Sequence, residues 1–271
     1  MAGLWPDDIQ CVVNLGFDID GESSWIGKDP ANAHRPVLTT MGEYGPRVGV
    51  PRILQMLDDY GIKASFFIPG HTAESHPEMV KKILAQGHEV AGHGYMHERP
   101  ADITPEQEVE TLDKGLGILE KVAGQKVKGY RVPGGEPSKQ TMSLLAERDL
   151  LYDSSLMDDD APYILNTEKG GLVEIPWHWL LDDFPYYHFA PAAGMRGPMD
   201  SPISVSNTWI AEFDGLYKEG RCMVLVLHPQ ITGHPSRLSG LERTIQHMLT
   251  RPNVAFMRAV DIAEYWLSRG A

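Results

Sequence analysis

The stretch CVVNLGFDID, residues 11–20, has the pattern of a buried β-strand that ends in two acidic side chains, Asp18 and Asp20. Side chains two residues apart on a strand point to the same face of the sheet, so these two carboxylates should lie side by side. Two like charges at such close range repel each other unless a positive group lies between or beside them. The stretch therefore predicts a strand whose end faces a cation.

Other short apolar runs alternate along the chain with amphipathic stretches that are typical of helices. The strands we predict span residues 10–17, 62–68, 89–92, 127–131, 151–153, 172–176, 222–228 and 254–257. The helices we predict span residues 47–60, 77–86, 105–123, 138–148, 206–219, 237–249 and 259–268. Alternation repeated this often indicates an α/β protein with a mainly parallel sheet. Seven or eight repeats favour a distorted (β/α) barrel of seven or eight mainly parallel strands over an open sheet.

Two kinds of local signal support these boundaries. Thr104 followed by Pro105 is typical of a helix N-terminus, where a side-chain cap precedes proline at the first helical position. Gly61 and Gly87 each follow a predicted helix, at the position where the left-handed conformation favours glycine. No internal repeat, low-complexity tract or flexible linker divides the chain, so we expect residues 1–271 to form a single domain.

The composition excludes some partners. The chain of 271 residues carries a net charge of −13, which argues against binding to nucleic acid or to an anionic membrane surface, since both are bound by basic patches. No stretch approaches the ~20 apolar residues of a membrane span. The first residues lack the basic start and apolar core of a secretory signal, so we expect a cytoplasmic protein.

Cys11 and Cys222 lie in apolar runs and are expected to be buried, free thiols.

Polar side chains follow several of the predicted strands. In a barrel of parallel strands the site lies at the carboxyl ends of the strands. The polar residues at these ends are Asp18, Asp20, His93, Arg131, Asp153 and His228. We therefore expect them to face one another at one end of the barrel.

His93 and His97 form a His-x-x-x-His motif. On a helical turn, residues i and i+4 share a face with Cβ atoms about 5–6 Å apart, so both imidazoles would reach one divalent ion. Alone this motif is weak, because a chain with 11 histidines produces such spacings by accident. Two histidines and one carboxylate with an open position are a common catalytic zinc arrangement. We therefore predict that Asp20 binds the cation with them, while Asp18 stays ionised as a base.

The chain resembles the polysaccharide deacetylase family, also called carbohydrate esterase family 4 or the nodulation-deacetylase homology domain. Four motifs in the family's order carry the resemblance: FDIDG (17–21), HGYMH (93–97), RVP (131–133) and LVLH (225–228). They extend over nearly the whole chain. The resemblance implies a distorted (β/α) barrel, which agrees with the strand–helix alternation. It also implies a metal-dependent hydrolase of carbon–nitrogen bonds other than peptide bonds.

The resemblance is closest to a branch that includes a cytoplasmic-type peptidoglycan deacetylase, cyclic imide hydrolases and a ureide hydrolase. This branch has Asp-x-Asp in the first motif, as here. The stretches GEYGPRVGVPRIL (42–54), WLLDDFPYY (179–187) and HPQITGHPSR (228–237) are also similar to its members. Gly134-Gly135 departs from the family, in which an aromatic residue often follows Arg-x-Pro. Members of the branch suggest a homo-oligomer.

The resemblance implies a role for each matched residue. One divalent ion, Zn²⁺ or alternatively Co²⁺, Ni²⁺ or Mn²⁺, is held by Asp20, His93 and His97. Asp18 is the base that takes a proton from water, and Arg131 orients Asp18 and keeps its pKa low. The alternative for Arg131 is a surface salt bridge.

His228 is then the general acid that protonates the departing nitrogen; the alternative is a satisfied core histidine. Asp183 is the preferred support for His228, with Asp182 and Asp153 as rivals. A backbone N–H near residues 130–131 is a candidate to hold the oxyanion. Glu22 stays open, either as a contact to substrate or as a loop cap.

Three functions compete. The first is removal of acetyl from N-acetylated sugars, or action on a related small amide. The second keeps the metal chemistry and opens a small cyclic imide or ureide ring, which the missing secretory signal favours. The third is a non-catalytic carbohydrate-binding barrel. The aromatic stretch PWHWLLDDFPYYHF (176–189) is either a core stripe or a pocket wall, and residues 43–47 form a glycine-rich loop that lies near the pocket in this branch.

Overall fold

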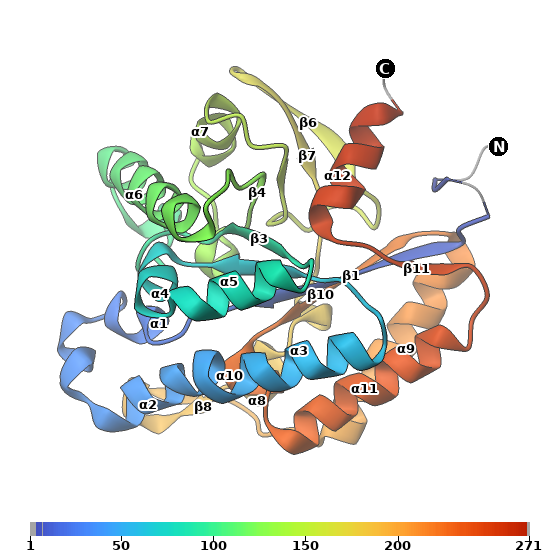
Figure 1. The fold of residues 1–271 in the computed structure, drawn as a ribbon, viewed down its shortest axis with the longest axis horizontal. Coiled ribbons are helices and arrows are strands. Elements are labelled where there is room, and N and C mark those ends of the chain that lie inside the picture. The colour runs from blue at the N-terminus through green and yellow to red at the C-terminus, as the bar shows by residue number, and fades with distance from the viewer. Residues whose placement is uncertain (1–3, 7, 270–271) are drawn as a thin grey trace.

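The computed structural model describes residues 4–6 and 8–269. Its main sheet has the strand order β10-β1-β2-β3-β4-β5-β7-β6, with β11 paired to β1 as well. All pairs in this sheet are parallel except β6 with β7. A parallel bridge from Asp182 to Val226 of β10 brings the chain that follows β7 back to the opposite edge of the sheet. The predicted α/β fold, a distorted and incompletely closed barrel, is therefore confirmed (Figure 1).

The strands are two to eight residues long. They are β1 (Cys11–Asp18), β2 (Ser65–Ile68), β3 (Glu89–Gly92), β4 (Gly129–Tyr130), β5 (Tyr152–Asp153), β6 (Tyr163–Thr167), β7 (Gly170–Glu174), β8 (Phe189–Ala190), β9 (Met195–Arg196), β10 (Cys222–Leu227) and β11 (Val254–Phe256). The hairpin β8–β9 forms a separate sheet. Every predicted strand overlaps an observed one, whereas β6, β8 and β9 were not predicted.

The helices are α1 (Ser23–Ile26), α2 (Pro36–Tyr44), α3 (Val50–Asp59), α4 (Gly70–Ser75), α5 (Pro77–Ala85), α6 (Pro105–Ala123), α7 (Thr141–Glu147), α8 (Phe184–Tyr187), α9 (Pro202–Glu219), α10 (Pro229–Thr232), α11 (Pro235–Leu249) and α12 (Ala259–Ser268). The predicted bounds of α6 and α12 are confirmed, and α9 begins at Pro202 rather than at residue 206. The capping signals also hold. Thr104 and Gln107 form a reciprocal capping box at the start of α6, and Gly61 and Gly87 have φ values of 64° and 78°.

Strand β1 separates two apolar clusters. Cys11, Val13, Leu15 and Phe17 join the cluster that packs against the helices outside the sheet, among them α3, α5, α6, α9 and α11 (Figure 1). Val12 joins the cluster on the inner face. Because strand side chains alternate, Asp18 points to the same inner face as Val12.

The inner face is closed at one end and open at the other. At the N-terminal ends of the strands, the start of α12 covers it: Ala259 N–H donates to Ser65 Oγ at 2.7 Å and Val260 N–H donates to Glu89 Oε2 at 3.0 Å. The C-terminal ends of the strands open into a cavity. The fold thus leaves one end of the barrel available for a site.

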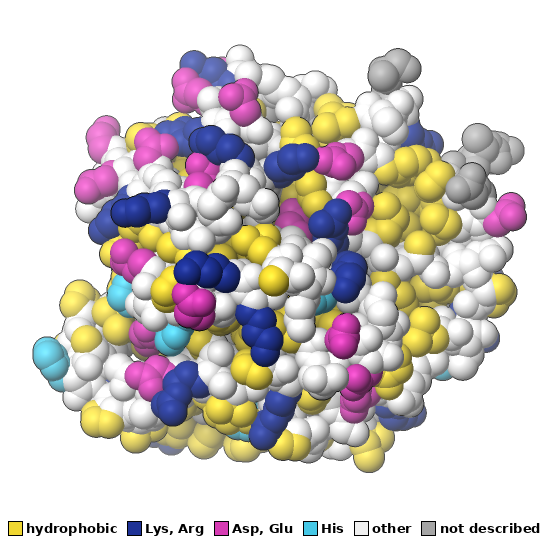
Figure 2. All heavy atoms as spheres, viewed as in Figure 1, with side chains coloured by type: hydrophobic (Ala, Val, Ile, Leu, Met, Phe, Trp, Pro, Cys, Tyr) yellow, Lys and Arg dark blue, Asp and Glu magenta, His cyan; other side chains and the backbone are white. Residues whose placement is uncertain are grey.

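Other expectations concern the surface and the thiols. On the face shown in Figure 2, Lys and Arg side chains are interspersed with Asp and Glu side chains rather than gathered into a basic patch. Among the residues that the structure describes, no helix has the length and apolar character needed to cross a membrane. Cys11 and Cys222 are buried, free thiols, as predicted.

Candidate metal centre and active site

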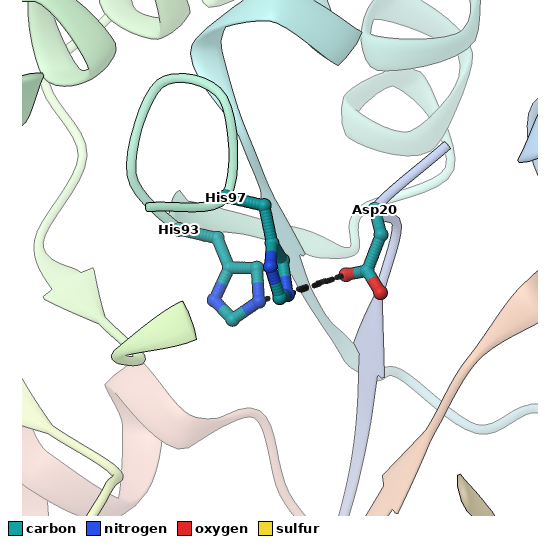
Figure 3. A group of neighbouring side chains, drawn as sticks. All are labelled: Asp20, His93 and His97. Atoms are coloured by element: carbon teal, nitrogen blue, oxygen red, sulfur yellow. Dashed lines mark ion pairs between the residues drawn. The ribbon is translucent and has the colours of Figure 1, made fainter. Parts of the chain in front are cut away.

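Asp20, His93 and His97 converge at the carboxyl ends of β1 and β3 (Figure 3). Asp20 Oδ1 lies 3.6 Å from His93 Nε2 and 3.7 Å from His97 Nε2. One donor atom from each of the three residues lies within 4.8 Å of the others. The two side chains from the loop after β3 and the carboxylate after β1 therefore form a group that could hold one metal ion.

The His-x-x-x-His motif is a loop, so the predicted helical turn is wrong. Gly94 and His97 have φ values of 72° and 60°, in the left-handed region, where a helix cannot continue. Glu98 Oε2 accepts hydrogen bonds from Tyr95 N–H at 3.0 Å and Met96 N–H at 2.8 Å. These bonds fold the loop back so that both imidazoles reach the same point. The two histidines do face the same point, but through a loop rather than the helical turn expected from their spacing, and the role of Glu98 was missed.

The polar atoms of this group fit a cation. Asp20 Oδ1 is buried and has no hydrogen-bond partner among the described residues, since 3.6 and 3.7 Å exceed hydrogen-bond range. His93 Nδ1 lies 2.7 Å from the carbonyl oxygen of Arg131, so Nδ1 is the donor and Nε2 presents a lone pair toward Asp20. Metal–ligand bonds of about 2.0–2.2 Å are compatible with donor atoms at these separations.

Protonation states agree with this fit. Burial lowers the pKa of His93 and of His97 to about 4, so both imidazoles are neutral at neutral pH, which is the form that binds metals. Burial raises the pKa of Asp20. A bound cation would act in the opposite direction, because an adjacent positive charge favours the ionised carboxylate.

Asp18 is paired with Arg131 beside this group. Arg131 Nη1 donates to Asp18 Oδ1 at 2.7 Å, and the guanidinium also donates to Ser154 O at 3.0 Å and Ser154 Oγ at 3.1 Å. Its central carbon lies 3.9 Å from the Phe67 ring centroid. A Cβ at Gly16 would lie 2.7 Å from Arg131 Nη1, so glycine is needed there. Arg131 is 1% exposed, which excludes the alternative of a surface salt bridge.

The ion pair controls the charge on Asp18. Burial alone would raise the pKa of Asp18, but the positive charge of Arg131 opposes this effect. The net pKa is lowered, so Asp18 is ionised at neutral pH. Asp18 Oδ2 lies 3.9 Å from His93 Nε2, which places this oxygen beside the candidate metal position.

His228, directly after β10, is held by Asp183. His228 Nδ1 lies 2.7 Å from Asp183 Oδ1, and its backbone N–H donates to Asp183 Oδ2 at 2.9 Å. Nε2 is thereby directed to Asp20 Oδ2, 3.9 Å away. Burial alone would lower the pKa of His228, but the negative charge of Asp183 and then that of Asp20 raise it well above its usual value. His228 is therefore a charged proton donor in this arrangement.

Asp182 and Asp153, the two alternatives to Asp183 as the support for His228, make different contacts. Asp182 Oδ1 is 3.8 Å from His228 Nδ1 and accepts from the backbone N–H of Phe184 at 2.7 Å. Burial raises the pKa of Asp182 to about 7. Asp153 instead accepts a hydrogen bond from Ser155 Oγ at 3.0 Å and neighbours Glu174 on β7. Of the three aspartates, Asp183 makes the short contact with the imidazole.

Three further observations revise the expected site. The Arg131 N–H donates to the carbonyl oxygen of Gly92 at 3.0 Å, so it is not free to hold an oxyanion. Gln230, which sequence reasoning missed, donates from Nε2 to Asp20 Oδ2 at 3.2 Å. Glu22 lies instead beside His76 and His71, at 3.5 and 3.9 Å. Gln230 carries no motif signal of its own beyond its position two residues after His228.

The site opens into a cavity of about 1140 Å³. The aromatic stretch contributes its wall, with Trp177, Trp179, Phe184, Tyr187 and Phe189 among the lining residues. Part of this wall is also core, since Trp177 and Tyr187 are buried while Trp179 and Phe189 are exposed. The stretch is thus both core and pocket wall.

The end of α2 also contributes to the wall of the cavity. A π-helical turn, Gly45–Gly49, joins α2 to α3. A Cβ on Gly49 would lie 2.2 Å from the carbonyl oxygen of Pro229, so this turn approaches the loop after His228 closely. Tyr44 lines the cavity and stacks on His234 with ring centroids 4.1 Å apart. Arg47 and Glu43 pair with each other at the surface.

Similarity to known proteins identifies the family of this chain. The sequence profile described as "Polysaccharide deacetylase" matches residues 31–152. A protein of Helicobacter pylori named "Peptidoglycan deacetylase" is 31% identical over 96% of this chain and 97% of its own length. The chain belongs to the polysaccharide deacetylase family. It is a hydrolase of the class that acts on carbon–nitrogen bonds other than peptide bonds.

Two solved structures extend the comparison. A protein from Mycobacterium smegmatis that is assigned to the polysaccharide deacetylases is 39% identical, with a TM-score of 0.95 over 98% of this chain and 93% of that chain. The structure of Puue allantoinase is 25% identical, with a TM-score of 0.87 over 99% of this chain and 94% of that chain. Both agree with the distorted barrel described above.

Proposed function

We propose that the protein is a metal-dependent amidohydrolase that removes acetyl from an N-acetylated sugar. The observation that carries this proposal is the buried, unpartnered Asp20 Oδ1, which faces two neutral imidazoles at the floor of a cavity. Asp20, His93 and His97 hold the ion, and Zn²⁺ suits this set of ligands best. A divalent ion held there would supply Lewis acidity toward the substrate carbonyl oxygen.

Asp18 serves as the general base. Its carboxylate is ionised because Arg131 holds its pKa down, and its free oxygen, Oδ2, lies next to the ligand nitrogen of His93. From this position Asp18 accepts the proton of the water molecule that attacks the carbonyl carbon. Arg131 fixes the orientation of the carboxylate and keeps Oδ2 available.

His228 serves as the general acid. Asp183 orients the ring and stabilises the imidazolium, so Nε2 carries a proton that faces the site. This proton passes to the nitrogen of the substrate as the carbon–nitrogen bond breaks. The base and the acid therefore differ in charge at neutral pH, as the reaction requires.

A second candidate function is the opening of a cyclic imide or ureide ring. It needs the same proton transfers, because a ring amide bond is broken in the same way. The similarity to the structure of Puue allantoinase favours it.

A turnover screen with metal-reconstituted protein tests both candidates. Acetate release from N-acetylglucosamine oligomers supports the first, and ring opening of succinimide, dihydropyrimidines or allantoin supports the second. Protein carrying Asp18→Asn, purified in the same way, controls for contaminating activity. Absence of turnover with all of these compounds would contradict both.

Further expectations belong to the same proposal. Residues 1–271 form one catalytic domain, the resident metal is Zn²⁺, and the protein is a cytoplasmic homo-oligomer. Elemental analysis of purified protein tests the metal, and light scattering after size exclusion tests the oligomer. Fractionation of the source cells tests the location.

A further inference from the structure

Arg237 is a cation in the wall of the cavity that contains the candidate metal centre. It belongs to the first turn of α11 and is half-buried. Its guanidinium carbon lies 4.4 Å from the centroid of the Tyr187 ring, so one face of the guanidinium is covered by an aromatic ring. Such stacking holds the planar group in place while its edge stays free to donate hydrogen bonds.

Two other arginines line the same cavity, and each is paired with a carboxylate. Arg131 Nη1 lies 2.7 Å from Asp18 Oδ1, and Arg99 Nη1 lies 3.0 Å from Asp102 Oδ2. Among the described residues, no carboxylate pairs with Arg237 within 4.0 Å. It donates a long hydrogen bond of 3.4 Å to the carbonyl oxygen of Ile231. A guanidinium has five N–H donors, so Arg237 retains donors for a ligand.

Asp183 is the acidic group whose charge acts on Arg237, and it does not take this role. Its two oxygens already accept hydrogen bonds from His228 and from the Thr232 hydroxyl. A structural ion pair between Asp183 and Arg237 is therefore not formed.

The position of Arg237 is also unfavourable for a cation. The N-terminus of a helix carries partial positive charge, which repels a positive side chain in the first turn, and the first turn of α11 holds no acidic residue that would compensate. Burial lowers the pKa of Arg237. Both effects would be relieved by an anion bound at this edge of the cavity.

We propose that Arg237 binds a carboxylate group of the substrate. The inference rests on the proposed function, because the anion and the scissile amide would occupy the same cavity. The substrate class is then an amide, either an N-acetylated sugar or a cyclic amide, that carries a carboxylate apart from the bond that is broken. The guanidinium edge matches a carboxylate with two parallel hydrogen bonds, and Tyr187 fixes the plane in which these bonds form.

The test compares matched compounds that differ in one carboxylate. N-acetylmuramic acid and N-acetylglucosamine form the first pair, and dihydroorotate and dihydrouracil form the second. Each is measured for kcat/KM with the metal-loaded protein and for binding by calorimetry. We expect the carboxylate member of one pair to be preferred by the wild type. We expect Arg237→Gln to lower its kcat/KM by about 10–100-fold, the usual size of a charged hydrogen bond, and that of the neutral member by less than about threefold.

Two variants control for folding. Arg237→Lys keeps the charge and should retain part of the preference. Arg243→Gln changes an exposed arginine in the same helix that donates to Ser206 Oγ and is not among the residues lining the cavity, so it should leave the preference unchanged. Circular dichroism of all three variants checks that the helix is intact.

The outcomes separate this inference from the proposed function. Equal losses for both members of a pair in Arg237→Gln, or no preference for a carboxylate in the wild type, would overturn the inference while turnover of the neutral compounds upholds the function. If no compound is turned over but calorimetry shows carboxylate binding that Arg237→Gln abolishes, the function fails and the inference stands. Absence of any carboxylate-dependent binding overturns the inference.

Discussion

Two pairs of buried carboxyl groups lie in the same sheet, and their surroundings differ. Asp18 ends β1 and Asp20 follows it, whereas Asp153 and Glu174 lie side by side on β5 and β7. All four are almost fully buried, with at most 3% of each exposed. Burial alone would raise every one of their pKa values. The neighbours of each pair decide whether a charge, a proton or a metal ion is present there.

A guanidinium and two imidazoles surround the first pair. Arg131 donates to Asp18, and two histidine nitrogens face Asp20 Oδ1. The pKa of Asp18 is consequently lowered despite its burial. The unpartnered oxygen of Asp20 faces imidazole nitrogens that also present lone pairs. Only a positive ion can satisfy all of these lone pairs at once.

Backbone groups surround the second pair. Glu174 Oε1 accepts from the N–H groups of Ser155 and Leu156, each at 2.9 Å. Asp153 Oδ2 and Glu174 Oε2 have no other partner among the described residues, and the pKa values of both groups are raised, first by burial. One proton held between these two oxygens satisfies both. The neighbours of an unpartnered buried oxygen therefore indicate what it can bind: imidazoles favour a metal ion, and a second carboxyl favours a shared proton.

The largest expected effect separates the two pairs directly. Asp18→Asn keeps an oxygen that accepts from Arg131, so the fold should persist, but an amide cannot take the proton of water. We expect kcat to fall by about 10⁴-fold, the upper end for general acid–base catalysis. Asp153→Asn replaces a carboxyl that shares a proton by an amide that can donate to Glu174, so we expect less than a twofold change. Steady-state kinetics of both variants makes the comparison.

An active Asp18→Asn protein would contradict this assignment, and the base would then lie elsewhere. A large loss in Asp153→Asn with intact metal content would show that the second pair contributes to the reaction. That contribution would pass through Ser154, which neighbours Asp153 and accepts from Arg131.

His228→Ala is expected to have the next largest effect. The variant removes the proton donor, so kcat should fall by about 10²–10⁴-fold, while the metal group of Asp20, His93 and His97 stays intact. Elemental analysis should find the same metal content as in the wild type. Loss of the metal in this variant would show that His228 is a ligand and that its assigned role is wrong.

Asp20→Asn should act on metal affinity before it acts on turnover. It removes the charged ligand, so we expect metal binding to weaken by at least about 100-fold, because changes in outer-shell partners alone cost 10–100-fold. Added metal should partly restore activity, whereas it should not restore Asp18→Asn. Metal titrations of the two variants, followed by activity, make the test. Rescue of Asp18→Asn but not of Asp20→Asn would reverse the two roles.

Much of the fold could be predicted because apolar periodicity and caps are local signals. Thr104, Pro105 and Gln107 specify the start of α6 within a few residues. Strand β6 was missed because its residues alternate between half-buried and exposed, with Ile164 on the exposed face, so it lacks the continuous apolar run of its neighbours. The start of α3 was also displaced, from residue 47 to Val50, because a π-helical turn occupies Gly45–Gly49.

The residues of the candidate site could likewise be predicted only in part. Residues at strand ends, such as Asp20, His93 and His228, could be predicted because the fold class places strand ends together. The loop geometry at His97 could not, since it depends on Glu98 and on left-handed residues rather than on spacing. Arg237 could not be predicted either, because its lack of a partner is a property of three-dimensional contacts. Nothing in a short motif reports which charges remain unpaired.

The smallest expected effect concerns stability at the second pair. Because the pKa values of Asp153 and Glu174 are raised in the folded protein, the folded state binds more protons than the unfolded chain above about pH 4. The free energy of unfolding should therefore fall as pH rises from the unfolded pKa toward the folded one. Asp153→Asn removes one titrating group and supplies an N–H donor in place of the shared proton. Between pH 5 and 8, its free energy of unfolding should fall by about 1 kcal/mol less than that of the wild type, roughly the value of one pKa unit.

Urea titrations at several pH values measure this difference, with Asp59→Asn, at an exposed position, as the control that should follow the wild type. Parallel curves for Asp153→Asn and the wild type would show that no proton is held between Asp153 and Glu174, and the contrast with the Asp18 and Asp20 pair would then have to rest on metal binding alone.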